Sequence, residues 1–419
     1  MQRSVKQPLG PLPGLPRRHG ADVPAARRTG RTLRWLIRGQ DPDPSPEQWR
    51  ALGESLTRGD PPADRLAAWM RAHGLGTTQP LFEQALNLGI SEVPDAPPEL
   101  REFFATVESI PDWVQPKLLL AGAKACHLSG LTGLQVLRDA ALMAGYQASA
   151  INRTLVLTGS LAKGAQRRVA ETTKWWIDCT TCGGLSRFAP GFKSTVRVRL
   201  MHALVRQRVQ AMPEWDAPSL GLPVNQGDMQ ATYLGFSVVF LFGQRVMGVP
   251  LSRDESEAVM HLWRYIAWLI GVDESLLLDT EMQGRVALYH NLLSQAPADD
   301  SSIALARALA DEPLSRHYGN ALPWFDRVQG RYEKAKHLSI CRYFLGGRGM
   351  RALGLPAGVL PWYPVMMVPF TALRHRLMRL LPGGRQALVR QGRAAQQDYL
   401  AVLFGSGEPD IARLPQPHG

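Results

Sequence analysis

The stretch SRDESEAVMHLWRYIAWLIG, residues 252–271, decides the fold class of this chain. Ser252 is followed three residues later by Glu255, and this capping box predicts the N-terminus of a helix. Apolar residues then recur at the helical period until Gly271, a residue type that commonly ends a helix. Ser45 begins a second capping box near the start of the chain. Because no alternating pattern of useful length predicts strands, the sequence indicates a mainly α protein.

Length and charge restrict the class of protein. A chain of 419 residues with 45% hydrophobic residues can bury a large core, arranged as one large domain or as two or three small ones. The formal net charge of +12 suits an anionic partner. The arginines are scattered over most of the chain, however, and no zinc finger or RNA-binding signature occurs. We therefore interpret the charge as a basic solvated surface and expect no nucleic-acid partner.

The four cysteines indicate the compartment. They are too few for a disulfide scaffold in a chain of this length, so a reducing, cytoplasmic location is expected. Cys179 and Cys182 have the spacing of a redox or zinc motif, but no second CxxC completes a zinc site. We interpret both as packing residues at a helix end. The first 44 residues contain no apolar run that predicts a signal peptide.

Composition divides the chain into four parts. Residues 1–43 are rich in Pro, Gly and Arg, and we expect them to form a disordered basic leader. Residues 44–112 are predicted to be an N-terminal helical segment, residues 113–280 a core of apolar helices, and residues 281–419 a C-terminal helical region that packs on the core. Within the last part, residues 354–370 are apolar but are interrupted by four prolines. A spanning helix is not expected there, and peripheral membrane contact is an alternative.

The stretch VRVRLMHALVRQRV, residues 196–209, contains one histidine. At the helical period, Val198, His202, Val205 and Val209 fall at i, i+4, i+7 and i+11, so the imidazole is expected to face inward with arginines beside it. A buried histidine must form a hydrogen bond, stay neutral or bind a metal. By these residues alone, a hydrogen-bonded core histidine is the plainer interpretation.

The preceding stretch RRVAETTKWWIDC, residues 167–179, is also predicted to be helical. Arg168, Thr172 and Trp175 share one face at i, i+4 and i+7, and Glu171 lies next to that face. An arginine and a carboxylate one turn apart are most often a simple ion pair.

Arg168-x-x-Glu171-Thr172, with His202 34 residues after the arginine, resembles the signature of the rubber oxygenase family. This family includes the latex-clearing proteins and the MpaB-type oxygenases. The stretches GYQASAINRTLVLTGSL and WDAPSLGLPVNQGDMQATYLGFS, which flank the motif, support the resemblance. The similarity extends over roughly residues 113–279.

The resemblance implies a haem b cofactor in a globin-like helical core, so residues 113–280 are expected to be a haem-binding oxygenase core. It implies that His202 is the axial ligand of the iron and that Arg168 and Thr172 contact the haem. Arg168, Glu171 and Thr172 are then the expected catalytic residues, and O2 and a small apolar substrate, isoprenoid or otherwise unsaturated, are the expected partners. No CxxCH motif for covalent haem attachment occurs.

The sequence departs from the latex-clearing branch at two positions. That branch carries a lysine where Glu171 stands and a glutamate that aligns with Asn152. A carboxylate at Glu171 can exchange a proton when burial raises its pKa, whereas Asn152 cannot act as a base. These departures leave the choice of substrate open.

Alternatives to the oxygenase remain at this point. A non-catalytic haem protein that senses or stores a gas needs His202 but not Glu171. A helical membrane-surface protein without a cofactor is the third hypothesis. Phe236 and Phe240 fit either a substrate pocket or ordinary core packing. The other histidines, His337 among them, are assigned no site, and the pattern specifies no oligomeric state.

Overall fold

The computed structural model describes residues 9–159, 164–320 and 322–405, and every regular element in these ranges is a helix. The N-terminal helices are α1 (Val23–Thr29), α2 (Arg31–Leu36), α3 (Pro46–Ser55), α4 (Pro61–Ala72), α5 (Leu75–Leu88), the 3-10 helix η1 (Ile90–Glu92) and α6 (Pro98–Glu108). The prediction of a mainly α protein is confirmed.

The central helices contain two π-helical segments, η2 and η3. In chain order, the central helices are α7 (Pro116–Leu128), α8 (Leu131–Gln135), η2 (Val136–Leu142), α9 (Met143–Gly145), α10 (Ser149–Leu157), α11 (Ala165–Thr180), α12 (Pro190–Gln210), α13 (Ala217–Leu220), α14 (Gln226–Leu234), η3 (Gly235–Val239), α15 (Phe240–Val246) and α16 (Arg253–Leu269). The C-terminal helices are η4 (Glu274–Leu276), α17 (Glu281–Ser294), α18 (Asp300–Asp311), η5 (Glu312–Ser315), α19 (Pro323–Ala352), α20 (Trp362–Leu380) and α21 (Gly384–Phe404).

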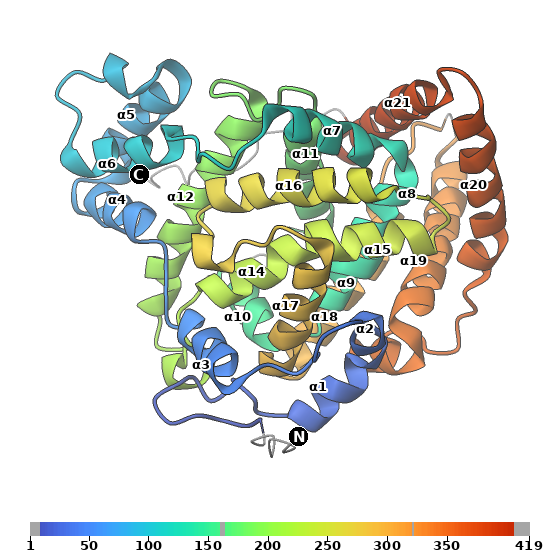
Figure 1. Ribbon diagram of the computed structural model, residues 1–419, viewed down its shortest axis with the longest axis horizontal. Coiled ribbons are helices and arrows are strands. Elements are labelled where there is room, and N and C mark those ends of the chain that lie inside the picture. The colour runs from blue at the N-terminus through green and yellow to red at the C-terminus, as the bar shows by residue number, and fades with distance from the viewer. Residues whose placement is uncertain (1–8, 160–163, 321, 406–419) are drawn as a thin grey trace.

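Helix α16 runs through the middle of the molecule (Figure 1). The capping box of Ser252 and Glu255 is present, and the helix ends before Gly271, as the sequence predicts. Its apolar residues are almost all buried in the main hydrophobic core. Gly122 of α7 allows the two helices to approach closely, because a Cβ atom at this position would lie 2.3 Å from the carbonyl oxygen of Ala258.

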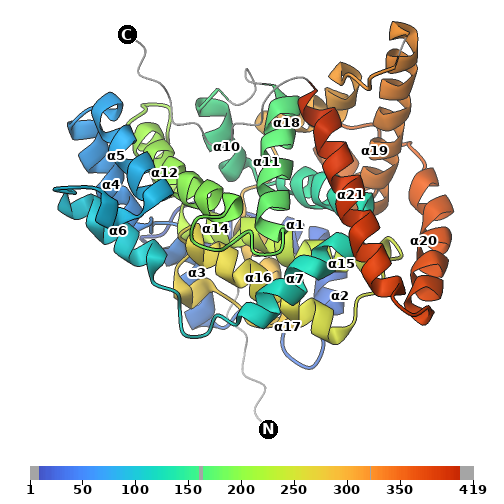
Figure 2. The ribbon, with the colours of Figure 1, turned by 90° about the horizontal axis from the view of Figure 1, so that it is seen from above.

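The outer helices gather at two ends of the molecule. Helices α4, α5 and α6 form one end, where α4 packs against α12. Helices α19, α20 and α21 form the other end (Figures 1 and 2). The site helices α11 and α12 lie between these two groups.

The segment before α3 is more ordered than its composition predicts. Arg18 forms a buried ion pair with Asp228 at 2.8 Å, and His19 stacks on Trp49 with ring centroids 3.9 Å apart. Helices α1 and α2 then pack against α17. The prediction of a disordered leader is therefore wrong for residues 9–43, because partners far along the chain neutralise and bury side chains that look solvated in the sequence.

The interpretation of the CxxC pair is half correct. Cys179 is buried at the end of α11, with its sulfur 3.3 Å from the hydroxyl of Thr195, and burial raises the pKa of its thiol to about 12. Cys182 lies beyond the helix end and is exposed. All four cysteines are free thiols.

Candidate functional site

The two helices of the family signature pack against each other. Arg168, Glu171 and Thr172 lie on α11, His202 lies on α12, and Figure 2 shows the two helices diverging from the turn that joins them. The indole nitrogen of Trp175 donates a hydrogen bond of 2.9 Å to the hydroxyl of Thr195. Trp175 shares the α11 face of Arg168, and Thr195 shares the α12 face of His202 at i and i+7. The hydrogen bond therefore turns the two signature faces toward each other.

The His202 imidazole is neutral and has an unpartnered nitrogen. Its Nδ1 atom is buried and makes no hydrogen bond to any residue that the structure describes. Burial, followed by the positive charge of Arg206, lowers the pKa of His202 from 6.5 to about 4, although Asp60 acts in the opposite direction. The expected hydrogen-bonded core histidine would need a partner for this atom, whereas a neutral ring with a free nitrogen is suited to bind a metal.

Two arginines of α12 are more deeply buried than most residues of its predicted apolar face. Arg199 and Arg206 are 5% and 2% exposed, whereas Val198, His202 and Val205 are only partly buried. The prediction that the histidine face is the inward one, with the arginines flanking it, therefore misses that Arg199 and Arg206 are the more deeply buried side chains. The physical reason lies on α4, which supplies a carboxylate for each of them.

Two ion pairs fix α12 on α4. Asp60, the residue before α4, accepts hydrogen bonds of 2.7 and 2.8 Å from Arg199, and Asp64 in the first turn of α4 binds Arg206. The Arg199 pair is bidentate, and such pairs fix orientation as well as distance, whereas Arg206 meets Asp64 through one nitrogen. Because the two arginines stand three residues before and four residues after His202, their ion pairs fix the rotation of this part of α12. Neither aspartate is recognisable from the sequence as part of the site.

The PVNQ segment, residues 223–226, also contacts α12 and the start of α4. Arg206 also donates a 2.8 Å hydrogen bond to the carbonyl oxygen of Val224, whose φ of +49° is uncommon for a β-branched residue. Asn225 caps α14, and the side-chain amide of Gln226 donates to the carbonyl oxygens of Gly59 and Gly271. This segment therefore joins the start of α4, the end of α16 and α12 into one support.

Arg168 lies beside Tyr146, a residue that sequence reasoning missed. Burial raises the pKa of the Tyr146 phenol, while the charge of Arg168, the charge of Arg138 and a hydrogen bond from Arg168 act against burial. Asn152 of α10 is tied to the same tyrosine, because its amide nitrogen donates to the Tyr146 carbonyl oxygen at 2.7 Å. The Oδ1 atom of Asn152 is buried and has no hydrogen-bond partner among the described residues.

Glu171 binds a different arginine from the one expected. Its Oε1 atom is 2.7 Å from Nε of Arg167, at i and i+4 spacing, and the Arg167 side chain is largely exposed. Arg168, at i−3, turns instead to Tyr146. The structure therefore brings Arg168 to the Tyr146 phenol and places Glu171 in a partly exposed pair. Thr172 is exposed on the face that α11 turns toward α12.

The two phenylalanines differ in their surroundings. Phe240 is fully buried and packs against Trp176 with ring centroids 5.7 Å apart, which identifies it as a core residue. Phe236 is partly buried in the π-helix η3, where it stacks on Trp263 at 4.9 Å and meets the edge of Trp175 at 5.3 Å. Phe236 thus connects the α11 face of the site to α16, and π-helical segments are frequent at functional sites.

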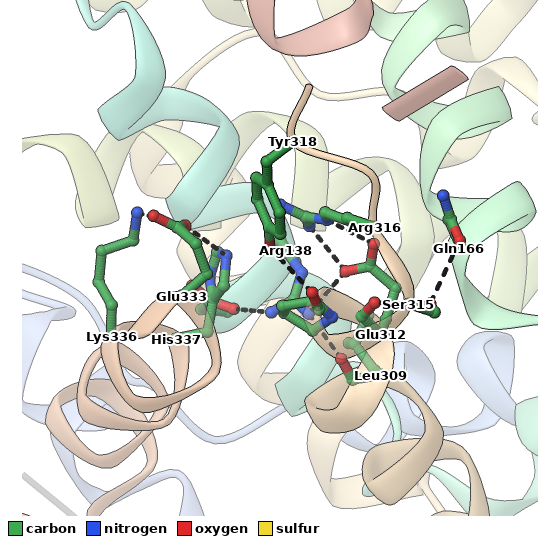
Figure 3. Close-up of polar contacts among 12 residues, drawn as sticks. Arg138, Gln166, Leu309, Glu312, Ser315, Arg316, Tyr318, Glu333, Lys336 and His337 are labelled. Carbon is green, nitrogen blue, oxygen red and sulfur yellow. Dashed lines mark hydrogen bonds and ion pairs between the residues drawn. The ribbon is translucent and has the colours of Figure 1, made fainter. Parts of the chain in front are cut away.

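Arg138, whose charge also acts on the Tyr146 phenol, belongs to a second buried polar cluster. Figure 3 shows this cluster around Arg138 and Glu312. Asp139 of η2 is 2.5 Å from Nδ1 of His337 and 2.6 Å from Arg138. Glu312 binds Arg138 at 3.1 Å and Arg316 at 2.6 Å. Burial and then the charge of Arg138 lower the pKa of His337, against the attraction of Asp139. With His337 neutral, Arg138 and Arg316 balance the charges of Asp139 and Glu312, so we interpret the cluster as structural.

No group of three or more His, Cys, Asp or Glu side chains that could bind a metal ion occurs in the part of the chain that the structure describes. A protein-built metal centre of several ligands is therefore not indicated there. A haem iron has different requirements, because the macrocycle supplies four ligands and the protein can supply one. His202, with its unpartnered buried nitrogen, is a residue that could supply that ligand.

Comparison with known proteins places this arrangement in a family. Residues 130–380 match the family described as "ER-bound oxygenase mpaB/B'/Rubber oxygenase, catalytic domain". Rubber oxygenase from Streptomyces sp. (strain K30) is 26% identical over 235 residues, which are 54% of this chain and 52% of that protein. The chain therefore spans about half the length of this curated relative.

A solved structure shares the fold. "Structure of Latex Clearing Protein LCP in the closed state" matches with a TM-score of 0.67 and 19% sequence identity, over 84% of this chain and 93% of that chain. The resemblance seen in the sequence is confirmed. Because the matched residues are more than half of its length, the chain belongs to the family of ER-bound oxygenases mpaB/B' and rubber oxygenases.

Proposed function

We propose that this chain is a haem b-dependent oxygenase that acts with O2 on an apolar, unsaturated substrate of the isoprenoid kind. The observation that carries the proposal is the neutral His202 ring, whose Nδ1 atom is buried without a partner in the described part of the chain. Membership in an oxygenase family supports the reaction class, and the similarity to a rubber oxygenase supports the substrate class.

The residues around His202 fit a haem. His202 would bind the iron, and the exposed Thr172 together with Arg168 would contact the cofactor from the facing side of α11. When bound, haem would supply O2 binding and activation. The ion pairs of Arg199 and Arg206 with α4 fix the helix that carries His202, so the position of the residue that would bind the iron is held.

The α11 side of the site supplies charge and protons. Arg168 places a positive charge beside the phenol of Tyr146, which burial keeps protonated and able to donate. Glu171 supplies a carboxylate that Arg167 holds at 2.7 Å, and we propose that it exchanges a proton during turnover. Phe236 provides an apolar wall for the substrate between Trp175 and Trp263.

The absorption spectrum of the purified chain tests the cofactor. After expression with sufficient haem, we expect a Soret band and a b-type pyridine haemochrome, because the sequence has no covalent attachment motif. A folded but colourless protein from such cells would overturn the cofactor proposal, because the chain would then fold without binding haem.

Substitution of Glu171 tests the proton role. Glu171→Ala should keep the Soret band and lower O2 consumption with squalene as the isoprenoid probe by about 10² to 10⁴-fold, which is typical for loss of a general acid or base. Glu257→Ala is the matched control, because Glu257 forms an exposed i,i+4 pair with Arg253 on α16 at the same 2.7 Å. Turnover at the parental rate in both variants would reduce Glu171 to a surface ion-pair partner.

A second candidate function is a non-catalytic haem protein that binds a gas. One observation favours it: Asn152 cannot act as a base, and its amide nitrogen donates to the carbonyl oxygen of Tyr146 and, at 3.1 Å, to the hydroxyl of Ser302. Such a protein would bind O2 reversibly without forming a product from squalene. Product analysis under air therefore separates the two functions.

A further inference from the structure

Helix α20 exposes a row of apolar side chains, which we call the α20 face. It consists of Met366, Phe370, Leu373, Leu377 and Leu380, which recur at i, i+4, i+7, i+11 and i+14. Phe370 is 67% and Leu380 is 80% exposed. Exposed apolar surface of this extent in a folded protein marks an interaction site.

The opposite side of α20 is the one that packs on the protein. Pro364 and His375, which lie about half a turn away from the α20 face, are buried. The helix is continuous through Pro369, so the prolines that interrupt the apolar sequence do not prevent an amphipathic helix. Figures 1 and 2 show α20 at the outer edge of the molecule, beside α19 and α21, with no described helix beyond it.

An aromatic contact joins the start of α20 to α19, which also exposes aromatic side chains. The ring of Tyr332 lies 6.1 Å from that of Trp362, the first residue of α20, and Trp324 and Phe325 are exposed further along α19. Tyrosine and tryptophan are enriched where proteins meet the interface between a bilayer and water.

Positive charge accompanies the apolar face. Residues 334–397 contain eleven lysines and arginines and no aspartate or glutamate. Arg374 and Arg376 stand on the two sides of the α20 face, next to Leu373 and Leu377 in the sequence. Arg379 and Arg385 share the single carboxylate of Glu255, each at 2.9 Å. Arg374 and Arg376 have no carboxylate partner in the described part of the chain, and Arg374 donates a hydrogen bond of 2.6 Å to the side-chain oxygen of Gln391.

The charge pattern selects the occupant of this face. If a second copy docked here in a two-fold dimer, the arginines beside the two α20 faces would lie close together. The face carries no carboxylate that could pair with them. An anionic lipid bilayer offers acyl chains to the apolar row and headgroup phosphates to arginines that extend beside it. None of the described helices is long and apolar enough to cross a membrane, which is compatible with a helix that lies in the bilayer surface.

We propose that α20 is a membrane-surface helix that docks this protein on anionic lipid bilayers, with the α20 face buried at the acyl boundary and Arg374 and Arg376 at the headgroups. Vesicle flotation of the full chain tests this. We expect binding to vesicles of phosphatidylcholine and phosphatidylglycerol at 3:1, weaker binding to pure phosphatidylcholine, and release by high salt.

Variants locate the binding on α20. Phe370→Glu/Leu377→Glu should lower binding to the mixed vesicles more than tenfold, because it places two carboxylates in the apolar row. The matched control is Leu88→Glu/Ile110→Glu, which makes the same change at two residues 60% and 67% exposed at the other end of the molecule and should bind as the parent does. Arg374→Gln and Arg376→Gln should each weaken binding about fivefold, as expected for one interfacial arginine.

Three outcomes would overturn the proposal. The parent chain does not float with anionic vesicles, or Phe370→Glu/Leu377→Glu floats as well as the parent, or the parent sediments as a dimer that this variant converts to a monomer. The last outcome would assign the α20 face to a second copy. Haem content and turnover play no part in these measurements, so they are independent of the proposed oxygenase function.

Discussion

The arginines of α12 and those of α20 have the same chemistry and opposite surroundings. Arg199 and Arg206 are buried and each has a carboxylate from α4, at 2.7 Å in the case of Arg199. Arg374 and Arg376 are exposed and have no described carboxylate. A paired, buried arginine serves the fold, because its charge is already satisfied. An exposed arginine without a carboxylate remains available to a partner.

The comparison also separates two ways to present an apolar helix face. On α12 two arginines are buried in ion pairs with α4, and His202 shares the helix face of Thr195, which accepts a hydrogen bond from Trp175 of α11. On α20 the apolar row faces outward, and the basic residues lie beside it. We therefore expect α12 to hold a small group inside the molecule and α20 to contact something outside it.

The largest expected effect is the loss of all bound haem. His202→Ala removes the unpartnered imidazole but leaves the pairs of Arg199 and Arg206 intact, so the chain should fold and lose its Soret band. Absorption spectra and circular dichroism of the variant, expressed with sufficient haem, measure the two properties separately. His375→Ala is a matched control, because Nδ1 of His375 is also buried without a described partner. A His202→Ala protein with the parental Soret band would remove His202 from the site.

The next effect is the cost of an unpaired buried arginine. Asp60→Ala leaves the guanidinium of Arg199 buried without its carboxylate, and we expect the free energy of unfolding to fall by about 3–5 kcal/mol. Urea unfolding measures this change. Glu102→Ala is the control, because the side chains of Glu102 and Arg65 are both half exposed and such pairs contribute about 0–1 kcal/mol. Equal losses in the two variants would contradict the distinction between buried and exposed arginines.

The sequence predicts some parts of this molecule well. The capping boxes at Ser45 and Ser252 are local signals, because the side chain that caps and the amide it caps are three residues apart. The signature residues Arg168 and His202 were recognised through their spacing. Local periodicity and family pattern thus gave the helices and the candidate ligand.

The sequence predicts contacts between distant residues poorly. Asp60 and Asp64 bind arginines about 140 residues away, and no local signal marks them as partners. Arg18 and Asp228 show the same limit, since composition made their segment look disordered. Glu171 is a different case, because two arginines one residue apart compete for it and the helix geometry selects Arg167. The uneven charge of residues 334–397 was visible in the sequence but acquires meaning only beside the exposed α20 face.

A smaller effect is expected from acid. Because the pKa of His202 is about 4 in the folded chain and 6.5 when unfolded, the unfolded state binds more protons between these values. The contribution of neutral His202 to stability is complete above pH 6.5 and is lost as the pH falls toward 4, by at most about 3 kcal/mol. Urea unfolding of the haem-free protein from pH 7 to pH 4 measures the slope. For His202→Gln, the free energy of unfolding should change less steeply with pH than for the parent chain. An equal slope would show that Asp60 compensates the charge of the protonated ring.

The smallest expected effect concerns the exposed arginines. Arg376→Gln should change the free energy of unfolding by less than about 0.5 kcal/mol, because its charge has no described carboxylate and its side chain is exposed. The same substitution should weaken binding to anionic vesicles about fivefold, whereas Asp60→Ala should reduce stability without a specific effect on lipid binding. If the arginines of α12 serve the fold and those of α20 serve a partner, Asp60→Ala lowers mainly the stability in urea. Arg376→Gln then lowers mainly the binding in vesicle flotation. A large stability loss in Arg376→Gln would mean that α20 depends on this residue for its own packing, and the contrast between α12 and α20 would fail.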